Sequence, residues 1–189
     1  MNLKKQIRKE MTIDHLNIAI YEQPKVMADN ASDFVEKNIK EAINKSGFAN
    51  IILATGSSQL LFLEALRNKG IDWKKITVFH LDEYKDISPN HPASFRKYLK
   101  DRILSFVNPK KVYFLNGNAA DCEKEMRKYE QILINHPIDI ACIGIGENGH
   151  IAFNDPGEAD FNDRDQVKLV NLDEACRRQQ FTEGWFPSF

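Results

Sequence analysis

Short apolar runs that alternate with helix-period segments constrain the fold of this chain more than any other feature. We expect strands at residues 16–21, 51–54, 76–81, 112–115 and 138–143. Between these runs, apolar residues recur every three or four positions, which is the spacing of a helix with one buried face. Strands that alternate with helices in this way predict an α/β fold, with a parallel sheet and helices on both faces.

Chain length and charge limit the organisation and the partners of the protein. The 189 residues are enough for one sizeable core and too few for two. We therefore expect a single domain over residues 1–189. The formal net charge of −1 provides no basic field for nucleic acid or an anionic membrane, so neither is expected as a partner.

The cysteines and the N-terminal segment indicate where the protein works. Cys122, Cys142 and Cys176 are widely spaced and form no CxxC pair, so no disulfide framework is predicted. The N-terminal segment is charged and lacks the apolar stretch of a secretion signal. The histidines show no HxxxH or HxH spacing, so no metal site is predicted. Together these features favour a reducing, cytoplasmic setting.

A glycine–serine turn follows the apolar run at residues 51–54. Thr55, Gly56, Ser57 and Ser58 lie where a strand ends and a helix begins. Helix N-terminal amides carry partial positive charge and the hydroxyls add donors, so the turn can seat a phosphate. It lacks the lysine of a nucleotide P-loop and does not match GxGxxG. The alternative is a simple helix cap, and the turn alone does not decide between the two.

Two adjacent acids follow the run at residues 76–81. Asp82 and Glu83 project to opposite sides if the strand continues, so only one is expected to face a ligand. A carboxylate at this position can take a proton from a carbon next to a carbonyl if burial adjusts its pKa. The alternative is a solvated acidic turn, which the two residues alone favour.

The segment 144–157 combines a glycine-rich loop with one imidazole and a nearby acid. His150 follows Gly149 directly and lies just past an apolar run, which favours a functional histidine over a structural one. Asn148 and Asp155 are placed to orient the imidazole, as a third group does in hydrolytic triads.

Three separated segments resemble the glucosamine-6-phosphate deaminase/isomerase family, whose relatives include the 6-phosphogluconolactonases. They are residues 53–58, residues 79–95 with Leu-Asp-Glu-Tyr and His-Pro-Ala-Ser-Phe, and residues 143–157. The resemblance implies a Rossmann-like sheet. It also implies the conversion of glucosamine 6-phosphate into fructose 6-phosphate and ammonia, with a small sugar phosphate as partner and no metal or organic cofactor. A homo-oligomer is compatible with it.

The resemblance also implies residue roles. Asp82 would shuttle a proton between C1 and C2, and His150 would open the pyranose ring with help from Asn148 and Asp155. The substrate would be bound by Thr55, Gly56, Ser57, Ser58, Gly149 and Arg177.

The chain departs from the family pattern at three places. Asn148 stands where many members have aspartate, and Asp155 replaces the usual glutamate. Members also continue past residue 189 with further strands and a helix, so we expect an incomplete domain with weak activity or none on its own.

Two other functions stay open at this point. One is hydrolysis of 6-phosphogluconolactone, and the other is sugar-phosphate binding without turnover. Tyr84 and the Ala-Phe-Asn run at residues 152–154 favour the deaminase over the lactonase. The presence of both Asp82 and His150 argues against a non-catalytic protein.

Overall fold

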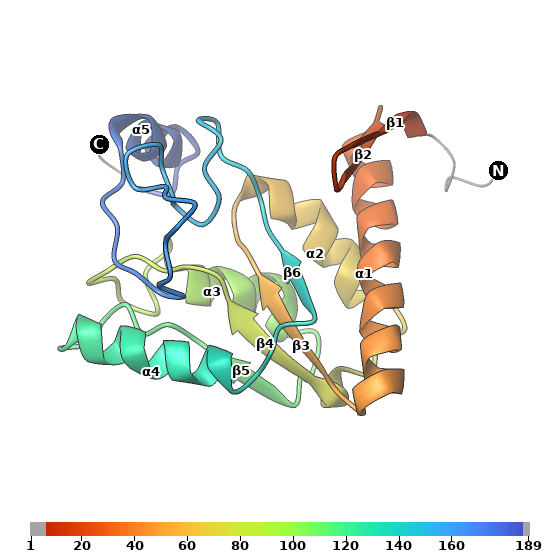
Figure 1. Cartoon of the computed structure of the whole chain (residues 1–189), viewed down its shortest axis with the longest axis horizontal. Coiled ribbons are helices and arrows are strands. Elements are labelled where there is room, and N and C mark those ends of the chain that lie inside the picture. The colour runs from red at the N-terminus through yellow and green to blue at the C-terminus, as the bar shows by residue number, and fades with distance from the viewer. Residues whose placement is uncertain (1–6, 187–189) are drawn as a thin grey trace.

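A four-stranded parallel sheet forms the centre of the computed structural model, which describes residues 7–186 (Figure 1). Its strands are β3 (Ala49–Leu53), β4 (Ile76–His80), β5 (Lys111–Tyr113) and β6 (Ile140–Cys142). Their spatial order is β5-β4-β3-β6, and every neighbouring pair is parallel. The chain thus builds outward from β3 to β5 and then returns to the other side of β3. This arrangement confirms the predicted α/β class.

Helices cover both faces of this sheet. Their bounds are α1 (Pro24–Ser46), α2 (Leu60–Arg67), α3 (Phe95–Leu99), which continues as a π-helical turn η4 (Lys100–Leu104), α4 (Cys122–Ile134) and α5 (Glu174–Thr182), with short 3₁₀ turns η2 (Ser57–Gln59) and η3 (Trp73–Lys75). The helices α1, α2 and α3 pack with Ile51 and Val78 in the main core. On the opposite face Phe79 contacts Tyr129 of α4, with ring centroids 6.3 Å apart. The two central strands β3 and β4 are therefore buried on both sides, as mostly apolar strands predict.

The early strand at residues 16–21 is confirmed, but it does not belong to the parallel sheet. It is β2 (Leu16–Tyr21), which pairs antiparallel with β1 (Ile7–Ile13) in a separate hairpin. Asp14 and His15 form its two-residue connection, with Asp14 at φ +52°. Most of β2 is exposed or half-buried, so it lacks the burial that holds a strand inside the sheet. Figure 1 shows the hairpin beside the start of α1, away from the other strands.

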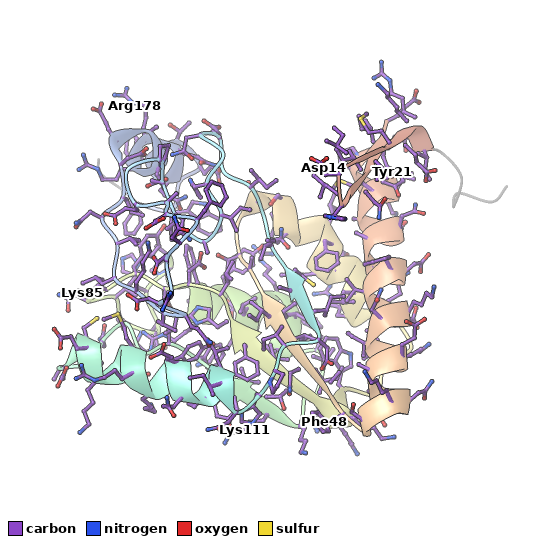
Figure 2. The ribbon with its side chains drawn as sticks, in the orientation of Figure 1. Asp14, Tyr21, Phe48, Lys85, Lys111 and Arg178 are labelled. Atoms are coloured by element: carbon purple, nitrogen blue, oxygen red, sulfur yellow. The ribbon has the colours of Figure 1, made fainter. Side chains whose placement is uncertain are left out.

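The segment that follows β6 lies over the carboxyl end of the sheet, together with α5 (Figure 1). Figure 2 marks the two ends of the molecule: Phe48 and Lys111 lie at the amino ends of β3 and β5, and Arg178 lies at the opposite end on α5. Among residues 7–186, no helix is both long enough and apolar enough to cross a membrane.

Candidate active site

A cavity of about 140 Å³ opens at the carboxyl end of the sheet. Segments that follow three strands line it: residues 54–58 after β3, Leu81 and Asp82 after β4, and residues 144–146 with His150 after β6. Helix α5 and the turn after it add Gln179, Gln180, Glu183 and Trp185. The cavity therefore lies beside the point where the strand order reverses around β3, which is where open α/β sheets bind their ligands.

The turn after β3 is held in a conformation that needs glycine. Gly56 has φ +103°, a region that side-chain-bearing residues rarely adopt. The Tyr98 hydroxyl, which comes from α3, donates to the Gly56 carbonyl at 2.7 Å. Ser57 then begins the turn η2 that leads into α2. The predicted phosphate seat of residues 55–58 thus has a fixed backbone and faces the cavity.

Asp82 lies on the cavity wall with one carboxyl oxygen shielded from solvent. This oxygen, Oδ1, is buried and has no hydrogen-bond partner among the residues that the structure describes. Burial, and then the nearby charge of Glu83, raises the pKa of Asp82 to about 7. A carboxyl with such a pKa both accepts and releases a proton readily near neutral pH, as a general base must.

Glu83 turns toward α3 and binds its first turn. Its carboxylate, with 1% of the side chain exposed, accepts from the Ser94 hydroxyl at 2.9 Å and from the Phe95 backbone at 3.0 Å. It also accepts from the backbone and Nε of Arg96, both at 3.1 Å. The two adjacent acids therefore have separate surroundings: Glu83 is paired in the interior, and Asp82 faces the cavity.

His150 is oriented by Asn148 and Asp155, as predicted from the sequence. Its Nδ1 lies 2.7 Å from Asn148 Oδ1 and 3.0 Å from Asp155 Oδ1. The Asn148 amide nitrogen donates to Asp155 at 2.8 Å and to Asp173 at 3.0 Å, which fixes its oxygen toward the imidazole. Because both neighbours of Nδ1 are acceptors, we assign the proton of the neutral ring to Nδ1. Nε2 then keeps its lone pair for proton exchange.

The loop that carries His150 has backbone strain and close packing. Any side chain at Gly146 would collide with the imidazole ring, so only glycine permits this position of His150. Two and three residues after His150, Ala152 and Phe153 have positive φ, at +53° and +59°. Non-glycine residues are uncommon in this region, and such strain is concentrated at functional sites.

Two predicted substrate-binding residues do not line the cavity. Arg177 is exposed on α5 and is not among the lining residues. Gly149, at φ +86°, forms the turn before His150 and donates its amide to the Gly146 carbonyl at 2.9 Å. Its place in the structure is to shape the loop, and a direct role of either residue in substrate binding stays a prediction.

The structure adds residues from α5 and its C-terminal turn that sequence reasoning missed. Glu183 Oε2 accepts from the Ser57 hydroxyl at 3.2 Å and from Trp185 Nε1 at 3.0 Å, so a carboxylate lies beside the predicted phosphate seat. Among the described lining residues there is no Lys or Arg.

The Tyr84 hydroxyl donates to Gln180 at 2.7 Å and so connects the loop after β4 to α5. No motif in α5 indicates these contacts.

A second and larger cavity, of about 520 Å³, adjoins the first. Its wall includes Asp82 and Phe153, which line both cavities, and Tyr129 of α4. Asp82 thus lies at the boundary between them. The smaller cavity is lined by His150 and the glycine–serine turn, so it is the one that brings the predicted catalytic and phosphate-binding residues together.

Comparison with known proteins identifies the family of this chain. Residues 22–180 match the family described as glucosamine-6-phosphate isomerases/6-phosphogluconolactonase. Proteins named glucosamine-6-phosphate deaminase from Bacillus cereus and Bacillus thuringiensis are each 32% identical over 163 residues, which is 86% of this chain. The chain spans 60% of the length of these relatives.

Solved structures of the same family resemble this chain. A monomeric glucosamine-6-phosphate deaminase of the NagB superfamily superposes with a TM-score of 0.76 at 31% identity, over 88% of this chain and 68% of that one. A 6-phosphogluconolactonase from Shewanella baltica shares the fold, with a TM-score of 0.61 at 20% identity over 69% of this chain and 57% of that one. The chain belongs to the glucosamine-6-phosphate isomerase/6-phosphogluconolactonase family.

Proposed function

We propose that this protein isomerises and deaminates glucosamine 6-phosphate to fructose 6-phosphate and ammonia. The observation that carries the proposal is the placement of Asp82 and His150 on the walls of one small cavity, next to the turn at residues 55–58. Relatives at 32% identity that bear the name of this deaminase support the same substrate.

The reaction begins at His150. With the proton of the neutral ring on Nδ1, Nε2 takes the proton of the sugar O1 hydroxyl and returns one to the ring oxygen, which opens the pyranose. Asn148 and Asp155 keep the imidazole in this tautomer, because both offer oxygen acceptors to Nδ1. The open chain then has an aldehyde at C1 and an amine at C2.

Asp82 performs the isomerisation. Its carboxylate removes the proton from C2 while O1 takes a proton from solvent, which gives an enolamine, and the protonated carboxyl then delivers its proton to C1. This leaves an imine at C2, which water hydrolyses to the ketone of fructose 6-phosphate with release of ammonia. A carboxyl with a pKa of about 7 suits both halves of the transfer, because neither protonation state is strongly disfavoured near neutral pH.

The turn at residues 55–58 binds the phosphate in this proposal. Backbone amides at the start of η2 and the hydroxyls of Thr55, Ser57 and Ser58 supply donors for phosphate oxygens. Glu183 has to release the Ser57 hydroxyl when the phosphate enters, because the two anions repel each other. We place the enzyme in the cytoplasm, where its three free cysteines stay reduced.

A coupled assay tests the proposal. The 189-residue protein is incubated with glucosamine 6-phosphate, and both ammonia and fructose 6-phosphate are measured for the wild type and for Asp82→Asn. The exposed carboxylate of Glu41 on α1 provides a matched control, Glu41→Gln. Because the chain spans 60% of the length of its relatives, we expect slow turnover with equimolar products from the wild type and the control, and none from Asp82→Asn.

The same protein is then given 6-phosphogluconolactone. Hydrolysis of the lactone without ammonia release from the amino sugar would assign the family's other activity to this chain. Tight binding of glucosamine 6-phosphate with no turnover would instead indicate a non-catalytic sugar-phosphate-binding protein.

A further inference from the structure

Three donor side chains of different chemistry converge beneath the catalytic cavity. They are the imidazole of His150, the carboxylate of Asp155 and the thiol of Cys176, and one ligand atom from each lies within 4.8 Å of the other two. Asp155 and Cys176 are each 1% exposed, and His150 is half-buried. Because Cys176 comes from α5, 26 residues after His150, no metal-binding spacing in the sequence indicates this cluster.

We propose that His150, Asp155 and Cys176 form a binding site for a divalent transition-metal ion, zinc foremost, which inhibits the enzyme when bound. Zinc prefers a tetrahedral set of nitrogen, oxygen and sulfur ligands. With the usual bond lengths, donors around such an ion lie about 3.4 to 3.6 Å apart. The His150 Nδ1 and Asp155 Oδ1 atoms are 3.0 Å apart and the thiol lies within 4.8 Å of both side chains' ligand atoms, so the first pair has to move apart slightly when an ion enters. Three protein ligands leave a fourth position for water.

The charges around Cys176 also favour a cation. Burial, and then the carboxylates of Asp155, Asp173 and Asp82, raises the pKa of Cys176 to about 12. The carboxylates that disfavour a thiolate attract a divalent ion to the same place.

Binding proceeds by exchange of protons for the metal. The Cys176 thiol releases its proton to solvent, and the sulfur forms the metal–thiolate bond. The Nδ1 proton of His150 leaves, Nε2 acquires one from solvent, and the Nδ1 lone pair binds the ion. No electron is transferred.

The expected consequence is loss of ring opening, because Nε2 no longer offers a lone pair to the sugar. Deaminase activity and metal occupancy then exclude each other at this site.

Cobalt(II) spectroscopy tests the site directly, without any substrate. Cobalt takes the place of zinc and gives an intense thiolate-to-metal charge-transfer band in the near ultraviolet when a cysteine is a ligand. We expect this band on titrating the 189-residue protein with cobalt in the absence of thiol reductants, and its disappearance when zinc is added. The absence of the band in the wild type would overturn the proposal.

Two serine variants identify the thiol. Cys176→Ser is expected to abolish the band and to weaken zinc binding, measured by competition with a chromogenic chelator, by about tenfold or more. Cys122→Ser removes a half-buried thiol on α4 and is expected to keep both. A band that persists in Cys176→Ser, or disappears in Cys122→Ser, would contradict the assignment. Far-ultraviolet circular dichroism checks that each variant is folded, and neither result depends on which reaction the enzyme catalyses.

Discussion

Replacing Asp82 by asparagine is expected to stabilise the protein, and increasingly so as the pH rises. The pKa of this carboxyl rises from its ordinary value of 3.8 to about 7 in the fold, mainly because of burial. Ionising it therefore costs about 4 kcal/mol more in the folded protein than in the unfolded chain. Asparagine keeps the shape of the side chain and removes this cost.

The sign of the pH dependence follows from the raised pKa. The folded protein holds the Asp82 proton between about pH 4 and about pH 7, where the unfolded chain has released it. The favourable contribution of this group is complete below about pH 4, falls as the pH rises toward 7, and is absent above that. The stability advantage of Asp82→Asn should thus grow by about 2 to 3 kcal/mol between about pH 5 and about pH 8.

Urea unfolding at several pH values measures this advantage, with circular dichroism as the probe. Glu41→Gln serves as the control, since it removes an exposed carboxylate on α1. Its free energy of unfolding relative to the wild type should change little over the same range. The difference in unfolding free energy between Asp82→Asn and the wild type should depend on pH. If it did not, or if the wild type were the more stable at about pH 8, burial would not be the cause of the raised pKa of Asp82.

Three further substitutions test other parts of the site. Glu83→Gln leaves the buried guanidinium of Arg96 without its charged partner, so we expect a loss of about 3 to 5 kcal/mol in urea unfolding; an unchanged midpoint would refute this role. Asn148→Ala should lower kcat about 10- to 100-fold with little change in KM, because His150 loses an acceptor for Nδ1. Glu183→Gln should tighten the binding of inorganic phosphate about fivefold in calorimetry, since a negative charge leaves the phosphate seat; weaker binding would show that Glu183 assists it.

The central sheet was predictable because a short, mostly apolar run in the sequence marks each of its strands. The run at residues 76–81 is mostly apolar, and every residue of β4 is buried. The positions of the candidate catalytic residues follow from the same pattern, since parallel strands that enter from one end leave their following loops at the other end. This is why Asp82 and His150, 68 residues apart, could be placed at one edge from the sequence.

The contributions of α5 could not be predicted, because they depend on a long connection without a regular pattern. The helix is positioned by Asp173, whose carboxylate accepts from the Cys176 backbone at 2.6 Å and from Asn148 at 3.0 Å. Nothing in the sequence indicates these long-range contacts, so Glu183 beside Ser57 and Cys176 beside His150 appear only in the structure. The partner of β2 was missed for a related reason, since an exposed strand leaves its pairing weakly specified.

Proton exchange followed by NMR is the most direct test of the account. In deuterated water, the wild-type protein and glucosamine 6-phosphate should give fructose 6-phosphate with deuterium at C1, because the Asp82 carboxyl exchanges its proton with solvent during some transfers. Asp82→Asn should leave the C2 proton of the substrate in place over the same period. Exchange at C2 that continues unchanged in Asp82→Asn would show that another group removes the proton, and would contradict the mechanism.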